Sequence, residues 1–191
     1  SNATRAECAK ILLLFGKLGQ GEKPDEPDVA PELRMSERGV QFIKDHEGFT
    51  QYAMWDYAQW SIGYGTHCEK DEYPDGITRE QADILLRKEI AVKETAVSAF
   101  EKKIGRTLSA QQFDALVSFS YNVGSGWMSN PSYNVYRLIA SGSTDEMALV
   151  NALGSWIHAG GEALSGLACR RMDEANIYIN GDYTVRSNRY L

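Results

Sequence analysis

The chain has 191 residues, a length that fits one domain with a tail. Its 20 basic and 26 acidic side chains give a net charge of −6, which argues against a broad nucleic-acid-binding surface. Ten tyrosines, six phenylalanines and four tryptophans can supply a packed core, so disorder across the whole chain is excluded. The longest uninterrupted apolar run, Ile11–Phe15, is far shorter than the roughly 20 residues of a membrane-spanning helix, and we expect no membrane span in this sequence.

The first 34 residues differ in composition from the rest. Ser1-Asn2-Ala3 is typical of the remnant of a cleaved expression tag, and the apolar stripe of residues 4–16 predicts a short helix. Residues 17–34 hold three of the five prolines and a cluster of acids, which is typical of a linker. We therefore expect a tag remnant, a short apolar segment and a linker over residues 1–34, and one folded domain over residues 35–191. The domain itself carries a net charge of −5, because five bases and six acids precede it.

The beginning of the domain predicts a helix followed by two strands. Ser36 suits the N-cap position of a helix and Gly48 suits its C-terminal end, so Glu47 is expected in the last turn. Residues 49–66 are rich in aromatic side chains and lack a helical period. This composition favours two strands joined by a turn near residues 56–59.

The remainder of the domain predicts helices. Two Ser/Thr-x-x-Gln capping boxes begin helices that glycines end, at Thr78–Gly105 and Ser109–Gly124. Shorter helices are expected at 132–140, 144–157 and 167–179. The sequence therefore predicts an α+β fold of two lobes, a small β-rich lobe and a larger helical one, with a ligand cleft between them.

Cysteine and histidine spacing gives no metal motif. The three cysteines form no C-x-x-C pair and allow at most one intramolecular disulfide, and we expect free thiols at Cys8, Cys68 and Cys169. No H-x-x-x-H spacing relates the three histidines, His46, His67 and His158. We therefore expect neither a metal site nor a cofactor.

Glu47 and Asp56 are the candidate chemical pair. Glu47 faces the negative end of a helix dipole, with Phe49, Tyr52 and Trp55 as expected desolvating neighbours, and both influences favour the protonated form that a general acid requires. Asp56 falls in a polar turn, where it is expected to stay ionised. Two carboxyl groups in opposed environments are typical of a glycosidase. With 26 acids in the chain, however, the spacing alone does not separate this pair from ordinary surface acids.

Several motifs in register resemble the phage-type lysozymes of glycoside hydrolase family 24, the endolysins. The similarity covers roughly residues 35–181, in the family's order and spacing. Its strongest motifs are His46-Glu47-Gly48, Ser61-Ile62-Gly63-Tyr64-Gly65, Thr78-Arg79-Glu80-Gln81-Ala82, Leu108-Ser109-Ala110-Gln111-Gln112-Phe113-Asp114-Ala115-Leu116, Tyr121-Asn122-Val123-Gly124 and Trp156-Ile157-His158-Ala159-Gly160-Gly161.

The resemblance implies a lysozyme-like fold in which a long helix joins the two lobes. It implies a muramidase that cleaves the β-1,4 bond between N-acetylmuramic acid and N-acetylglucosamine in peptidoglycan and causes bacterial cell lysis. Glu47 then matches the proton donor, and Asp56 matches the second carboxylate, which assists the attacking water. Ser61 matches a threonine that positions this water. Such a single displacement inverts the anomeric configuration.

Three features depart from the family pattern. Ser61 follows Asp56 by five residues where the family usually has a threonine at six. The loop tip reads Thr66-His67 where many relatives have His-Thr. The domain is also acidic, whereas many phage lysozymes are basic, which helps them to reach an anionic wall. The shifted Ser61 and the acidic charge leave open the alternative of a catalytically weak wall-binding relative. A secreted antibacterial toxin with the same chemistry is a further alternative.

The same resemblance places Asn122, Arg170 and Arg171 near the substrate. One of the two arginines is expected to pair with an acid near Glu47, against the alternative of a solvated helix face. Asn122 suits a sugar contact or a helix cap equally well. The expected partner is peptidoglycan, with no nucleic acid, and the expected state is a monomer acting on the cell wall, in the periplasm or outside the cell.

Overall fold

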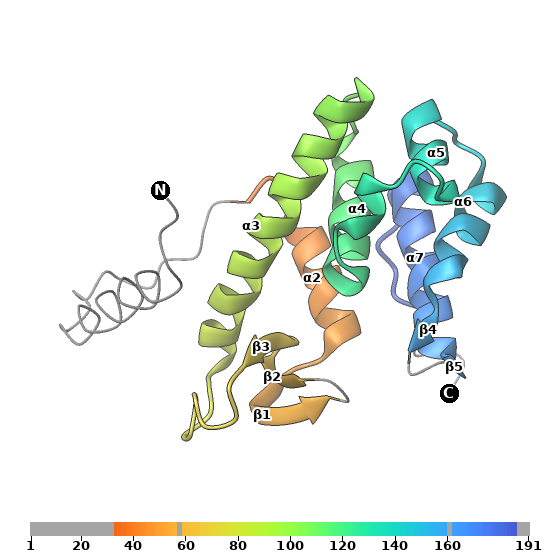
Figure 1. The fold of residues 1–191 in the computed structure, drawn as a ribbon. Coiled ribbons are helices and arrows are strands. Elements are labelled where there is room, and N and C mark those ends of the chain that lie inside the picture. The colour runs from red at the N-terminus through yellow and green to blue at the C-terminus, as the bar shows by residue number, and fades with distance from the viewer. Residues whose placement is uncertain (1–32, 57–58, 160–161, 187–191) are drawn as a thin grey trace, which may run out of the picture.

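The computed structural model describes residues 33–56, 59–159 and 162–186, without the side chains of Asp56 and Ala159 (Figure 1). The first element is α2 (Glu37–Glu47). The Ser36 hydroxyl accepts a hydrogen bond from the Gly39 amide at 3.2 Å, and Gly48 ends the helix with φ 70°, a conformation that favours glycine. The sequence prediction of this helix and of Glu47 in its last turn is confirmed.

A three-stranded antiparallel sheet follows, with the order β1-β2-β3. Its strands are β1 (Thr50–Asp56), β2 (Gln59–Gly63) and β3 (Thr66–Cys68). The first two strands lie where the sequence placed them, and residues 57–58 of the expected turn lie outside the described residues. The third strand was not predicted, because three residues are too few for an alternating pattern. An irregularity in the β1–β2 register between Thr50 and Met54 bends the first strand.

Two long helices form the centre of the molecule, α3 (Arg79–Ile104) and α4 (Ala110–Val123). Both predicted capping boxes are present, and both helices end at the expected glycines. In α4, every residue of the run 113–120 is buried. A helix that is buried all round has to be enclosed by others, and α4 contacts α2, α3 and α7.

The remaining elements complete the helical lobe. They are η1 (Gly126–Ser129), α5 (Asn134–Ser141), α6 (Glu146–Leu153), η2 (Gly154–Trp156), β4 (His158–Ala159), β5 (Glu162–Ala163) and α7 (Ser165–Asn180). Figure 1 shows α3 running from the small sheet to the helical lobe. The α+β fold with a linking helix is confirmed. None of the helices in the described ranges has the length and apolar character needed to cross a membrane.

The described part begins with residues that already contact the domain. Leu33 packs against the core, and Arg34 forms an ion pair with Glu101. The expected helix 4–16 and most of the expected linker lie outside the described residues, as does Cys8. The other two cysteines, Cys68 and Cys169, are free thiols, as predicted.

Candidate active site

Glu47 is fixed at the end of α2 by an arginine from the other end of the chain. Its Oε1 accepts a hydrogen bond of 2.6 Å from Nη1 of Arg170, 123 residues further on in α7. The Glu47 side chain is 20% exposed, whereas that of Arg170 is 4% exposed. The carboxyl group is therefore reachable from solvent, while the cation that holds it is enclosed by protein. The sequence predicted that one arginine of the last helix pairs with an acid near Glu47, and the structure pairs Arg170 with Glu47 itself.

The turn between β2 and β3 approaches the same carboxyl group. Gly65 has φ +86°, and a Cβ atom at this position would lie 3.4 Å from Oε2 of Glu47. A glycine is required here because of its backbone conformation, and it also leaves room beside the carboxyl group. Two of the expected aromatic neighbours, Tyr52 and Trp55, are 56% and 58% exposed. They therefore shield Glu47 from solvent less than the sequence suggested.

Arg170 and Arg171 share one buried carboxylate. Glu174 is fully buried, and its Oε1 accepts hydrogen bonds from Nε of Arg170 at 3.2 Å and Nη2 of Arg171 at 3.4 Å. The Ser118 hydroxyl donates to the same oxygen at 2.8 Å, and Arg171 Nε lies 3.0 Å from Oε2. Neither arginine lies on a solvated helix face, so this alternative is wrong.

Burial disfavours the charge of both guanidinium groups, but the net shifts of their pKa values are opposite. Desolvation disfavours the charge of Arg170, but the carboxylates of Glu47 and Glu174 outweigh it and raise the pKa of Arg170 above its ordinary value. Desolvation dominates at Arg171, where it lowers the pKa despite the attraction of Glu174. The pair thus depends on its carboxylate partners for the stability of its two charges.

Arg171 connects this cluster to Asn122. Its Nη2 donates a hydrogen bond of 2.9 Å to Oδ1 of Asn122, near the end of α4. Asn122 is exposed, so the buried arginine fixes the orientation of an amide at the surface. The helix end is capped instead by Gly124, whose amide donates to the Ser120 carbonyl. Asn122 therefore does not cap this helix end, and its contact with a sugar stays a prediction.

Tyr121, on α4, lies beside the site. Its hydroxyl donates a hydrogen bond of 2.8 Å to the Tyr64 carbonyl, which ties α4 to the β2–β3 turn. Burial, and next the charge of Glu47, raise the pKa of Tyr121, so the phenol stays neutral around pH 7. Phe113 and Phe119 are buried in the core.

Asp56 and Ser61 lie on the hairpin formed by β1 and β2. Asp56 is the last residue of β1 and pairs with Gln59, and Ser61 pairs with Met54 on β1 and His67 on β3. Positions 54, 56, 59 and 61 thus belong to one alternating set of the strand pair. Ser61 is half-buried.

The histidines are placed by neighbours other than a metal. The His46 side chain is 4% exposed and lies 3.6 Å from a carboxylate oxygen of the fully buried Asp173. Asp173 also accepts hydrogen bonds from the backbone amide and a guanidinium nitrogen of Arg186. His67 and His158 are exposed. Within the described ranges, no group of three or more His, Cys, Asp or Glu residues could hold a metal ion.

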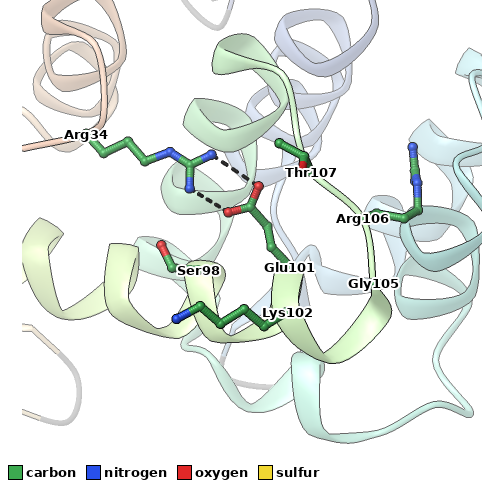
Figure 2. Close-up of a pocket in the computed structure, with 7 residues that line it drawn as sticks. All are labelled: Arg34, Ser98, Glu101, Lys102, Gly105, Arg106 and Thr107. Atoms are coloured by element: carbon green, nitrogen blue, oxygen red, sulfur yellow. Dashed lines mark hydrogen bonds and ion pairs between the residues drawn. The ribbon is translucent and has the colours of Figure 1, made fainter.

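A separate hollow of about 610 Å³ lies at the far end of α3 (Figure 2). Arg34 and Glu101 form a bidentate ion pair across it, with distances of 2.5 and 3.1 Å. Arg106 also borders it, and its guanidinium group donates to the Ile139 carbonyl. The charges at this hollow thus serve packing between the elements around it.

The structure joins four of the six predicted site residues, Glu47, Asn122, Arg170 and Arg171, in one hydrogen-bonded chain, and places Asp56 and Ser61 on the neighbouring hairpin. Sequence reasoning missed Glu174 and Ser118. The spacing of Glu174, four residues after Arg170 and three after Arg171, is the helical spacing of ion pairs and could have indicated it. Ser118 carries no comparable signal, because its partner is 56 residues away.

Comparison with known proteins defines the class. Residues 44–174 match the phage lysozyme family, and this segment is more than half of the chain. The chain therefore belongs to the phage lysozyme family, as its motifs indicated.

Individual relatives agree with this assignment. The endolysin of Bacillus phage B103 is 31% identical over 154 residues, which cover 78% of this chain and 56% of the relative. The endolysin of Bacillus phage PZA is 33% identical over the same length and shares. The chain thus spans a little more than half the length of these relatives.

Solved structures agree with the fold. The muramidase domain of SpmX from Asticaccaulis excentricus is 31% identical, with a TM-score of 0.64 over 76% of this chain and 97% of that one. The endolysin from Escherichia coli O157:H7 phage FAHEc1 is 26% identical, with a TM-score of 0.64 over 82% and 99%. The active form of the P1 phage endolysin, 19% identical with a TM-score of 0.63, covers 95% of this chain and shares its fold.

Proposed function

We propose that this protein is a muramidase, a glycoside hydrolase that cleaves the β-1,4 bond between N-acetylmuramic acid and N-acetylglucosamine in peptidoglycan. The observation that carries the proposal is the ion pair of Glu47 and Arg170. It fixes a solvent-reachable carboxyl group at the position of the family's proton donor, beside the hairpin of Asp56 and Ser61. The muramidase domain and the endolysins among the similar proteins support the same activity.

Glu47 acts in this proposal as the general acid. Arg170 holds Oε1, while Oε2 is the carboxyl oxygen nearest Gly65. A proton delivered to the glycosidic oxygen lets the leaving sugar depart as an alcohol. Because the carboxyl group is held by a hydrogen bond from a buried residue, its position relative to the bound sugar is fixed before the reaction.

Asp56 and Ser61 act on the water. Asp56 removes a proton from the attacking water, and the Ser61 hydroxyl, which can donate one and accept two hydrogen bonds, holds it. Attack from the face opposite the leaving group inverts the anomeric carbon, and pairs of this kind stand roughly 6.5–9.5 Å apart to leave room for the water. NMR of fresh product should detect the α-anomer, and direct formation of the β-anomer would contradict the inverting mechanism.

Clearing of purified peptidoglycan tests the activity. The wild type should clear the suspension, and Glu47→Gln, which keeps the shape but removes the proton, should be slower by about 10²–10⁴-fold. Asp56→Asn should also be strongly impaired. Sedimentation with the wall without clearing by the wild type would instead establish the wall-binding alternative. A Glu47→Gln variant that keeps most of its activity would exclude Glu47 as the acid.

The proposed place of action is the bacterial cell wall, with peptidoglycan as the partner and a monomer as the acting unit. An endolysin that lyses its host from within and a secreted antibacterial toxin would use the same chemistry. The endolysins among the relatives favour the first, in which the protein serves cell lysis.

A further inference from the structure

Glu174 lies at the branching point of the hydrogen-bonded chain that ends at Glu47. It is fully buried in α7, and neither of its carboxylate oxygens faces solvent. One branch runs through Arg170 to the carboxyl group of Glu47. The other runs through Arg171 to the amide of Asn122. A single buried carboxylate is therefore linked to both functional side chains that α2 and α4 contribute to the site.

The positive charge that holds Glu47 in place conflicts with the role of Glu47 as a proton donor. A cation within hydrogen-bond distance of a carboxyl group favours its ionised form, but a general acid must carry a proton. Arg170 stands in this relation to Glu47, and Arg171 adds a second buried positive charge close by. Glu174 offsets these charges from inside the protein, where Coulomb interactions are strong.

The carboxylate of Glu174 also fixes the orientation of the Arg170 guanidinium group. The Arg170 guanidinium uses Nε for Glu174 and Nη1 for Glu47, so the planar group is held from two sides. The hydroxyl of Ser118, from α4, fixes Glu174 in turn at 2.8 Å. A side chain anchored in this way leaves its partner little freedom to turn away from the site.

We propose that Glu174 is a positioning residue for the hydrolysis proposed above, on which this inference rests. Its buried carboxylate orients Arg170 toward Glu47 and Arg171 toward Asn122, and it offsets the positive charge of the two buried guanidinium groups.

The charge of Glu174 should also affect how kcat depends on pH. Among the described side chains, the groups that face Glu47 or lie beside it are Arg170, Arg171 and Glu174 on α7, Tyr121 on α4, and the adjacent His46 with Asp173. In Glu174→Gln one negative charge is lost while both arginines remain. The loss of a negative charge beside the site should move the high-pH limb of the kcat profile to lower pH.

The test compares Glu174→Gln with Asp114→Asn, using initial clearing rates over a range of peptidoglycan concentrations and pH. Asp114 is the matched control, a carboxylate that is 1% exposed and hydrogen-bonded to Ser36 and Tyr183, away from the Glu47 chain. Glu174→Gln should lower kcat by roughly 10-fold or more and shift the profile. Asp114→Asn should lower the melting temperature and leave the pH profile in place.

A double-mutant cycle tests the route through Arg170. Because part of the effect of Glu174 runs through Arg170, the loss of activity in Arg170→Gln/Glu174→Gln should be smaller than the product of the two single losses. Losses that multiply would overturn the proposal, as would a Glu174→Gln profile that superimposes on the wild type or an equal shift in Asp114→Asn. If Glu47→Gln clears peptidoglycan normally, the proposed function itself fails, which is a different result.

A milder change covers the case in which Glu174→Gln does not fold. Ser118→Ala removes one of the anchors of Glu174 and leaves its charge in place. It should lower kcat a few-fold, because the proton donor loses alignment, and it should change KM less than Glu174→Gln does, because Arg171 keeps its carboxylate partner. An unchanged kcat in folded Ser118→Ala would also contradict the positioning role.

Discussion

The Ser61 hydroxyl lies on the middle strand of the small sheet, between Met54 and His67. The backbone of Ser61 is therefore held by the strands on both sides, and this fixes the position of the hydroxyl group more firmly than a loop would. A serine lacks the methyl group of the family's threonine, and its side chain rotates more freely about χ1. The strand thus supplies part of the order that the methyl group would otherwise give.

We predict that Ser61→Ala lowers the rate of peptidoglycan clearing by roughly 10-fold or more, because the attacking water loses one of its partners. The melting temperature should change by no more than about 2 °C, since the strand pairing uses only backbone atoms. Ser61→Thr is the control and should keep most of the activity. Full activity in Ser61→Ala would remove Ser61 from the mechanism while leaving Glu47 in place.

Helices α3 and α4 are held together at their junction by Glu101, the carboxylate in Figure 2. Glu101 accepts hydrogen bonds from Arg34 and, at 2.7 Å, from the Leu108 amide just before α4. The Arg34 hydrogen bond, opposed by burial and assisted by the Leu108 amide, lowers the pKa of Glu101. This carboxylate therefore joins three segments of the chain, namely the residues before α2 at Arg34, the end of α3 and the start of α4.

We predict that Glu101→Gln destabilises the protein by about 1–2 kcal/mol at pH 7, because it removes a charge-assisted interaction whose other partner is partly exposed. Because the pKa is lower in the folded than in the unfolded state, the contribution is complete above the unfolded value of about 4.3 and is lost as the pH falls through the folded value. Urea unfolding at pH 7 and pH 3 should show the difference between wild type and variant shrinking at the lower pH. A difference that stays constant would contradict the assignment.

The elements that local signals define were predictable from the sequence. Capping boxes and glycines gave the ends of α3 and α4 because they act within four residues of the helix terminus. The contact between Glu47 and Arg170 joins residues 123 positions apart and depends on how α2 and α7 pack. The family motifs marked both residues, but only the fold shows that Glu174 lies between the two arginines.

At the scale of the whole molecule, the domain is proposed to fold and act without the segment that precedes it. The described contacts begin with Leu33 and Arg34, which pack against the core and against Glu101. We predict that a chain starting at Leu33 clears peptidoglycan as well as the full chain, with a melting temperature within about 3 °C. A drop of 10 °C would show that residues 1–32 stabilise the domain.

The net charge of −6 sets how the protein approaches its proposed substrate. An acidic protein is repelled by an anionic wall, and salt screens this repulsion over a Debye length of about 10 Å at 0.1 M. We therefore predict that clearing becomes faster, or at least no slower, between about 20 and 150 mM salt, the reverse of what a basic enzyme would show.

A charge variant separates this effect from other actions of salt. Asp71→Lys/Asp75→Lys changes two exposed residues in the segment between β3 and α3 and moves the net charge from −6 to −2. The variant should clear faster than the wild type at low salt and gain less from added salt, because less repulsion remains to be screened. Wild-type clearing that slows steeply with salt would mean that a local basic surface, rather than the net charge, guides the protein to the wall.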